Sequence, residues 1–180
     1  SSTEKSYEFT GLDRNYYYNI KVVVTDNYGN SLTGIKQVYV SCFVAGTKVY
    51  TENGYMNIED IKVGDYVYAL NLETNEQELK RVEKTIINES YELYHINIED
   101  EVVSTTPRHQ FYVVDKGWIR AYDLEIGDQL VTNDGIKTIS GIVYEKLDEP
   151  IKVYNLTVDG LHNYLVTEYS ILVHNSPSVV

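Results

Sequence analysis

The sequence predicts an all-β fold of pseudo-two-fold symmetry, with short helical turns, and three observations support this prediction. First, Tyr, Val and Ile favour strands, and 18 of the 180 residues are tyrosine. Second, turn signals such as Asn53-Gly54 and Asp159-Gly160 separate short β-rich runs. Third, part of the chain repeats itself. Only the brief stretches Ile58 to Ile61 and Ala121 to Leu124 are expected to be helical.

The first forty residues differ in character from the rest of the chain. Tyr16 to Thr25 alternates apolar and polar residues, which indicates a strand. A turn is expected over Asp26 to Asn30, and Ile35 to Val40 is expected to return as a second strand. The segment resembles the last strands of a fibronectin type III or PKD-like sandwich, which takes roughly 100 residues. We interpret it as a fragment of a host protein.

The repeat lies in the remaining part of the chain. Ile58 to Asn71 (IEDIKVGDYVYALN) matches Ala121 to Asp134 (AYDLEIGDQLVTND), with Gly-Asp at the same place in both copies. A second pair follows in the same order, Leu93 to Ile98 and Val153 to Val158. Each copy is a short turn that leads into a strand. Two copies are too few for a solenoid, so a pseudo-two-fold domain is expected.

Composition argues against several classes of function. The net charge of −12 argues against a nucleic-acid partner, and we interpret it as a contribution to solubility. No apolar run approaches about 18 residues, so no membrane span is predicted. Targeting motifs are not visible, so the compartment is not indicated. The single cysteine, Cys42, excludes an internal disulfide and is either a small buried apolar residue or a reactive thiol.

Several motifs in a fixed order carry a family resemblance. They are SCFVAGTKV from Ser41, TTPRH from Thr105, VYNLTV from Val153, HNY from His162 and ILVHNS from Ile171. Together they resemble the Hint superfamily of inteins, bacterial intein-like domains and hedgehog-type autoprocessing domains, and most of all the bacterial intein-like and pretoxin groups. This resemblance implies a horseshoe-like β domain over residues 42–175, a host fragment over 1–41 and a C-terminal flank over 176–180.

The resemblance implies a first reaction at the Ser41-Cys42 bond. The Cys42 thiol would attack the Ser41 carbonyl and turn the amide into a thioester, with thiolate as the nucleophile. His109 would protonate the departing nitrogen, a contribution of roughly 10²–10⁴ in rate. Thr106 would hold and polarise the scissile bond. His95, the remaining histidine outside the motifs, is expected to be a packing or supporting residue.

A second reaction is implied at the Asn175-Ser176 bond. The Asn175 side-chain amide would close on its own backbone carbonyl, form a succinimide and cut the chain. His174 and His162 would deliver a proton to the leaving nitrogen and polarise the carbonyl. The Ser176 hydroxyl could also attack the Cys42 thioester, in which case the flanks are joined by splicing. Otherwise water resolves the thioester and the ends are separated.

The balance between these outcomes stays open at this point. Asn155 stands where many splicing inteins carry an aspartate, and Pro177 stiffens the chain after the second junction. The alternatives are cleavage only, releasing a downstream toxin or surface module, and a non-catalytic β-rich surface or adhesion module. Hedgehog-type sterol transfer is disfavoured, because those domains lack the terminal His-Asn-Ser.

Neither a cofactor nor a metal is expected. His162 and His174 are too far apart in sequence for a compact ligand pair, and a structural zinc site normally uses more than one cysteine. The expected substrate is the protein's own flanking segments, with no nucleic-acid or membrane partner, and a monomer is expected. The N-terminal strands suggest a bacterial host protein that is secreted or held at the cell surface.

Overall fold

The computed structural model describes residues 18–25, 31–38 and 41–175. The chain divides into two compact units, residues 1–38 and 39–180. The first unit contains an antiparallel hairpin of β1 (Tyr18–Thr25) and β2 (Ser31–Val38). Its second strand begins at Ser31 and not at Ile35, while the expected turn over residues 26–30 and residues 39 and 40 lie outside the described residues.

The second unit is built almost entirely from strands, which confirms the all-β prediction. Two 3₁₀ turns, η1 (Ile58–Asp60) and η2 (Ala121–Asp123), stand where the sequence predicts brief helices. The remaining elements form one twelve-stranded sheet. Its strands are β3 (Phe43–Val44), β4 (Lys48–Thr51), β5 (Gly54–Asn57), β6 (Tyr66–Asn71), β7 (Glu76–Ile98), β8 (Glu101–Thr105), β9 (Gln110–Val113), β10 (Gly117–Arg120), β11 (Gln129–Thr132), β12 (Gly135–Val158), β13 (Asn163–Val166) and β14 (Ile171–His174).

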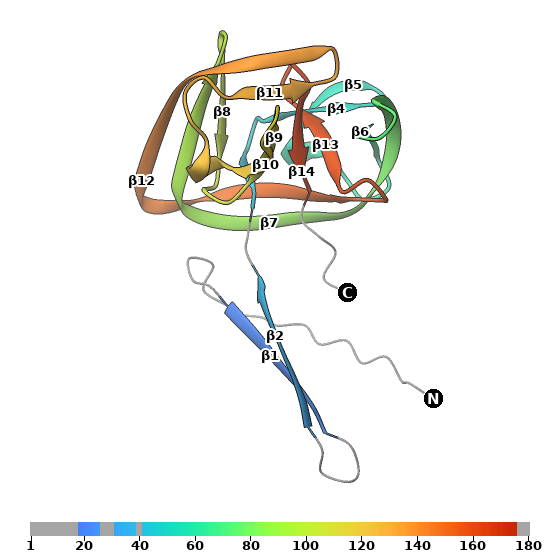
Figure 1. Ribbon diagram of the computed structural model, residues 1–180, viewed down its shortest axis with the longest axis vertical. Coiled ribbons are helices and arrows are strands. Elements are labelled where there is room, and N and C mark those ends of the chain that lie inside the picture. The colour runs from blue at the N-terminus through green and yellow to red at the C-terminus, as the bar shows by residue number, and fades with distance from the viewer. Residues whose placement is uncertain (1–17, 26–30, 39–40, 176–180) are drawn as a thin grey trace. The chain divides into compact units, whose positions relative to one another are not determined.

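The two longest strands form the frame of this unit. β7 has 23 residues and β12 has 24, and they pair antiparallel from Ile139↔Ile98 to Val158↔Val82. Irregularities in the register interrupt the pairing at three points, and such bulges bend a strand. Figure 1 shows both strands curving around the unit and lying next to each other along much of their length. The sheet therefore closes into an uneven ring.

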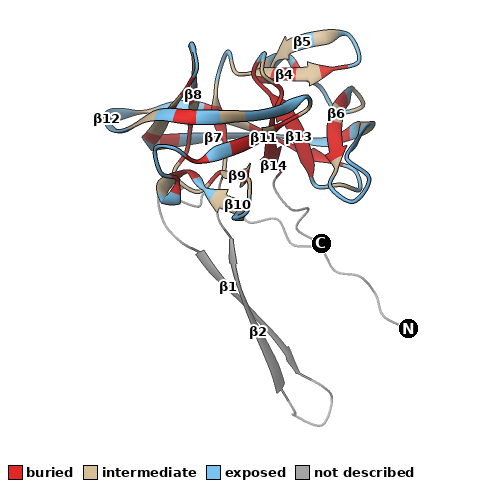
Figure 2. Cartoon of the chain, turned by 45° about the horizontal axis from the view of Figure 1, so that its top comes forward, coloured by how far each residue is buried: buried red, intermediate tan, exposed pale blue. Residues whose placement is uncertain are grey.

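The core lies inside this ring and includes the strands next to the chain's two junctions. All four residues of β13 and the first three of β14 are buried, and Figure 2 shows both strands in the interior of the unit. The main apolar cluster contains Phe43 of β3 together with Phe111 of β9 and Tyr164 of β13. The ends of the domain are thus anchored in its core, which fixes the backbone on the domain side of each junction.

The pseudo-two-fold repeat is visible in equivalent hydrogen bonds. The N–H of Gly64 donates to the Val82 carbonyl at 2.9 Å, and the N–H of Gly127 donates to the Ile139 carbonyl at 2.9 Å. In both copies the carboxylate of the aspartate after the glycine accepts a backbone N–H, at 2.8 and 3.0 Å. Each turn therefore bonds to the long strand of its own copy.

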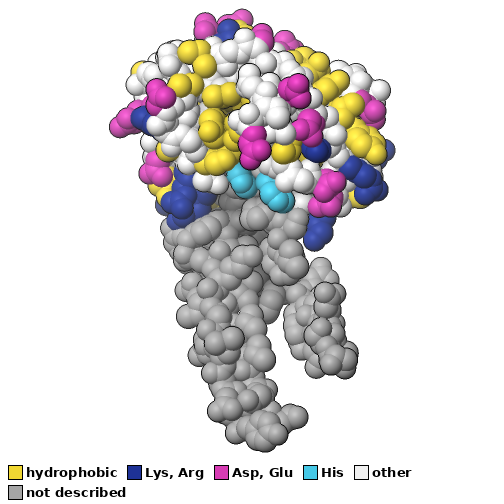
Figure 3. All heavy atoms as spheres, turned by 45° about the vertical axis from the view of Figure 1, so that its right-hand side comes forward, with side chains coloured by type: hydrophobic (Ala, Val, Ile, Leu, Met, Phe, Trp, Pro, Cys, Tyr) yellow, Lys and Arg dark blue, Asp and Glu magenta, His cyan; other side chains and the backbone are white. Residues whose placement is uncertain are grey.

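The surface of the second unit mixes charges with apolar side chains. Figure 3 shows acidic, basic and apolar side chains interspersed on one face. Such interspersion is typical of a solvated surface. Within the described ranges, no helix is long and apolar enough to cross a membrane.

Alanine at either repeat glycine is expected to destabilise the fold by a similar amount. Gly64 and Gly127 have φ angles of 101° and 97°, which L side chains rarely adopt, and a Cβ would meet no atom closer than 3.6 Å at either position. The loss is therefore one of backbone strain, about 1 kcal/mol in the free energy of unfolding. Urea unfolding of Gly64→Ala and Gly127→Ala measures it. A large difference between the two variants would contradict the equivalence of the copies.

Candidate functional site

Both the backbone N–H and the backbone carbonyl of Cys42 are hydrogen-bonded by Thr105, the last residue of β8, and Thr106. Its N–H donates to Thr106 Oγ1 at 2.9 Å. Its carbonyl accepts the Thr106 N–H at 2.9 Å and the Thr105 hydroxyl at 2.8 Å. The strand pairing Phe43↔Thr105 continues this contact. Thr106 therefore lies against the nitrogen of the Ser41-Cys42 bond, which is where the sequence predicts it.

The carbonyl on the other side of that bond is bound by Asn155 of β12. Asn155 Nδ2 donates to the Ser41 carbonyl oxygen at 2.5 Å and lies 3.3 Å from the Ser41 hydroxyl. The Asn155 side chain is buried, and its Oδ1 accepts the Leu156 N–H and the Tyr164 hydroxyl, both at 2.7 Å. The amide therefore presents a donor to the oxygen on which negative charge develops when the carbonyl is attacked.

The Cys42 sulfur lies in largely apolar surroundings. Cys42 is fully buried and packs with Leu93 and Val153. The side-chain amide of Asn88 on β7 donates to Sγ at 3.7 Å. The thiolate is the nucleophilic form of cysteine; the N–H directed at sulfur favours negative charge there, and the apolar burial opposes it.

His109 is a buried, neutral imidazole next to the first junction. It is fully buried against Phe43, with ring centroids 4.0 Å apart, and neither ring nitrogen makes a well-formed hydrogen bond with the described residues. Burial lowers the pKa of His109 to about 3; His174 adds to this effect, and the neighbouring Ser41 backbone opposes it. At neutral pH the ring therefore has a nitrogen that can accept a proton.

The second junction lies at the end of β14. The Asn175 N–H donates to the His162 carbonyl at 3.0 Å, and Asn175 Nδ2 donates to the Val158 carbonyl at 3.0 Å. The Asn175 backbone carbonyl lies 2.5 Å from His174 Nδ1. Because a carbonyl oxygen only accepts, Nδ1 carries the proton in this contact. Asn175 Oδ1 is buried and has no hydrogen-bond partner in the described part of the chain.

The two histidines at this end differ in their surroundings. His174 is partly buried, and the edge-on Trp118 ring lies 5.0 Å away between centroids. Burial lowers the pKa of His174, the Asn175 carbonyl opposes that shift, and His162 reinforces it. The His162 side chain is exposed, its φ is 54°, and its ring makes no hydrogen bond to a described residue. His162 therefore contributes its backbone carbonyl and its electrostatic effect on His174.

Both junctions lie along one stretch of β12. Asn155 binds the Ser41 carbonyl and Val158 binds the Asn175 amide, and three residues of strand span about 10 Å. The electrostatic effect of His174 on His109 also indicates that the two ends are close. The structure thus brings together every described residue that the sequence singles out for the two reactions; Ser176 lies outside the described residues.

Three side chains in the site are not predicted from the sequence. Thr105 precedes Thr106 in the same motif, and Tyr164 follows Asn163 in another. Both residues therefore lie within motifs of the family resemblance, although the sequence assigned them no role. Asn88 belongs to no motif of the family resemblance, and only the fold brings it to the sulfur.

His95 takes no part in either junction. His95 Nδ1 lies 2.7 Å from the Ser104 hydroxyl, and Nε2 lies 2.8 Å from a Glu145 carboxylate oxygen. These contacts link three neighbouring strands on a partly exposed surface. His95 therefore links neighbouring strands, as a packing or supporting residue would. The residues that it contacts do not belong to either junction.

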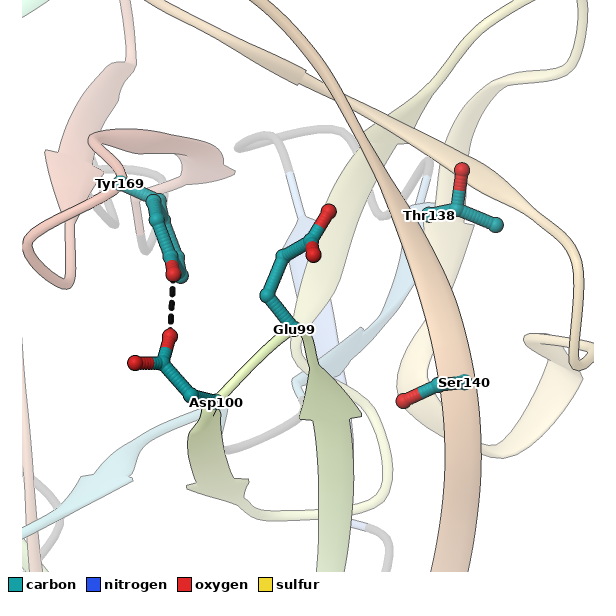
Figure 4. Close-up of a pocket in the computed structure, with 5 residues that line it drawn as sticks. All are labelled: Glu99, Asp100, Thr138, Ser140 and Tyr169. Carbon is teal, nitrogen blue, oxygen red and sulfur yellow. Dashed lines mark hydrogen bonds between the residues drawn. The ribbon is translucent and has the colours of Figure 1, made fainter.

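A separate depression of about 520 Å³ is lined by Glu99, Asp100, Thr138, Ser140 and Tyr169 (Figure 4). The Tyr169 hydroxyl donates to the Asp100 carboxylate. None of the residues predicted for the two reactions lines this depression. Among the described residues, no group of three or more His, Cys, Asp or Glu side chains is arranged to hold a metal ion.

Comparisons with known proteins show the family and the fold of this chain. The Pretoxin HINT domain family matches residues 48–176. The solution structure of a bacterial intein-like domain from Clostridium thermocellum is 43% identical, with a TM-score of 0.73 over 76% of this chain and 99% of that one. The gp41-1 intein is 25% identical, with a TM-score of 0.61 over 76% and 99%. A DnaB intein from Synechocystis sp. is 21% identical, with a TM-score of 0.65 over 77% and 100%, a likeness of fold. No curated protein matches.

Acidification is expected to destabilise the domain through His109. Unfolded chains bind a proton at this histidine below about pH 6.5, whereas the native chain does so only near pH 3. The unfolded state therefore binds more protons in that interval, and stability falls as the pH drops through it. At pH 4.5 the loss relative to pH 7 is about 2 to 3 kcal/mol from this residue.

Urea unfolding at both pH values measures this loss, in a Cys42→Ala/Asn175→Ala chain that cannot process itself. Adding His109→Leu should flatten the dependence on pH. An unchanged dependence in the leucine variant would mean that the buried imidazole is not its source.

Proposed function

Because this chain belongs to the Pretoxin HINT domain family, we propose that residues 42–175 are a self-processing domain that cuts the bonds Ser41-Cys42 and Asn175-Ser176. The observation that carries the proposal is that each scissile carbonyl accepts a hydrogen bond from a side chain of the domain, Asn155 at one junction and His174 at the other. Residues 1–41 and 176–180 would be the flanks on which the domain acts.

The first reaction is an N–S acyl shift. The Cys42 sulfur attacks the Ser41 carbonyl carbon, a C–S bond forms and the C–N bond breaks. The Asn155 amide stabilises the oxyanion, and Thr106 Oγ1 holds the Cys42 N–H. The proton leaves the thiol and ends on the Cys42 nitrogen, which becomes an amine. The products are a thioester and a free α-amino group within the same chain.

His109 is suited to carry that proton. Its low pKa, caused mainly by burial, leaves the ring neutral at rest. A neutral imidazole first accepts the thiol proton and then, as a short-lived cation, gives it to the departing nitrogen. This order differs from a resting imidazolium that acts only as an acid. A positioned group of this kind contributes roughly 10²–10⁴ in rate.

The second reaction is cyclisation of Asn175. Its Nδ2 attacks the backbone carbonyl carbon, the bond to the Ser176 nitrogen breaks and a succinimide forms. Nδ2 loses one proton, and the leaving Ser176 nitrogen gains one. Before the reaction, an Nδ2 hydrogen is hydrogen-bonded to the Val158 carbonyl. The N–H of His174 Nδ1 stabilises charge on the attacked carbonyl. Among the described residues, Asn175 Oδ1 has no hydrogen-bond partner, so the amide is held only through Nδ2.

Thiol-induced cleavage tests the first reaction. Incubation of the full chain with dithiothreitol at neutral pH should release residues 1–41, while Cys42→Ala should stay whole at that junction. His109→Ala should slow release by about 10²-fold or more. The matched control is His95→Ala, which alters a histidine outside the site and should leave the rate unchanged. Release from Cys42→Ala at the wild-type rate would exclude the proposed chemistry.

The masses of the products distinguish joining of the flanks from simple cleavage. We expect separate flanks to predominate, because a serine hydroxyl needs a base to become a nucleophile. The side chain beside the Ser41 carbonyl is the Asn155 amide, which does not transfer protons at neutral pH. Intact-mass measurement of freshly expressed chain gives the ratio, and Ser176→Ala should abolish any joined product without stopping cleavage. A predominantly joined product would contradict this expectation.

A further inference from the structure

Tyr164 occupies an unusual place for a tyrosine. It lies on β13, pairs with Val173 of β14 and is fully buried in the main core. Burying a hydroxyl requires a hydrogen-bond partner, and the Tyr164 hydroxyl has one in Asn155 Oδ1, at 2.7 Å. Tyr164 thus connects the core to Asn155, the residue whose side chain binds the Ser41 carbonyl.

The orientation of the Asn155 amide decides whether it can assist the reaction. An amide offers a donor at one end and an acceptor at the other. In the orientation present, Nδ2 faces the Ser41 carbonyl and Oδ1 faces two donors, the Leu156 N–H and the Tyr164 hydroxyl. Rotation by half a turn would direct Oδ1 at the Ser41 oxygen, where two partial negative charges repel. It would also set the Nδ2 hydrogens against the Leu156 N–H.

We propose that Tyr164 is a positioning residue for the N–S acyl shift: its hydroxyl holds the Asn155 amide with Nδ2 towards the Ser41 carbonyl, so that the donor is in place before charge develops. This inference rests on the proposed function. The hydrogen bond of the Tyr164 hydroxyl is made to Asn155 Oδ1, so we assign the effect of the tyrosine to that amide. Preorganised donors are effective because no reorientation is needed at the moment of reaction.

The state of the phenol agrees with this role. Burial, reinforced by the proximity of Cys42, raises the pKa of Tyr164 well above its usual value. The hydroxyl therefore keeps its proton throughout the neutral range and remains a donor. Only a donor complements Asn155 Oδ1, so the contact does not weaken when the pH rises towards the ordinary range for tyrosine.

The effect should be confined to one junction. The contacts of Asn175 are made with His162, Val158 and His174, and neither Asn155 nor Tyr164 is among them. Loss of the hydroxyl should therefore slow the first reaction and spare the second. General damage to the core would slow both.

The test compares Tyr164→Phe with the wild-type chain at both junctions. We expect thiolysis by dithiothreitol at Ser41-Cys42 to slow about tenfold, less than the 10²–10³ that loss of an oxyanion donor produces, because Asn155 is retained. Cleavage at Asn175-Ser176, measured in a Cys42→Ala background, should stay within about twofold. The matched control is Tyr50→Phe, since the Tyr50 ring stacks on other tyrosines and its hydroxyl makes no hydrogen bond to a described residue.

A double-mutant cycle separates positioning from packing. Asn155→Ala should slow thiolysis by about 10²-fold, and Tyr164→Phe added to it should have an effect of no more than about twofold if the tyrosine acts through the amide. Independent effects that multiply would overturn the inference, as would wild-type thiolysis in Tyr164→Phe or equal slowing at both junctions. Wild-type chain that is not cleaved by thiol would instead remove the proposed function, and this inference with it.

Discussion

Antiparallel pairing between β7 and β12 is the constraint on which the rest of the domain depends. These strands bury few side chains along their middle sections, so their backbone hydrogen bonds hold them together where side-chain packing contributes little. Their curvature encloses the short strands that lead to both junctions. β12 also supplies Asn155 to the first junction and Val158 to the second. A slip of one residue in its register would turn these contacts to the opposite face.

Around the first junction, polar side chains are almost completely shielded from solvent. Cys42, His109 and Asn155 have between 0 and 1% of their surface exposed. In such surroundings a hydrogen bond to a developing charge is stronger than in water, and an unpaired polar atom is more costly. Among the described residues, neither the ring nitrogens of His109 nor Asn175 Oδ1 has a well-formed hydrogen bond. The proposed proton transfer uses the His109 ring, and the proposed cyclisation uses the Asn175 amide. The polar atoms whose burial is costly for stability therefore belong to the reacting groups.

Much of this arrangement could be predicted from the sequence, because local patterns encode it. Gly-Asp turns, strand-forming residues and the repeat gave the β class and both 3₁₀ turns, and the ordered motifs gave the residues at each junction. The lengths of β7 and β12 could not be predicted, since their charged middle sections lack alternation and are ordered by pairing with each other. Asn88 and Tyr164 were missed for a related reason. Each meets its partner across the fold, and a hydroxyl or amide does not reveal in sequence where it points.

The mutual influence of His109 and His174 has a consequence for timing. Burial and the nearby His174 lower the pKa of His109, and burial lowers the pKa of His174. Repulsion between two positive charges acts on both rings, so a proton on one imidazole disfavours a proton on the other. While one ring carries a proton in transit, the other is therefore less able to take one up. The two cuts would share a single electrostatic environment that admits one travelling proton at a time, so the chain is biased towards consecutive rather than simultaneous bond breaking without any moving part.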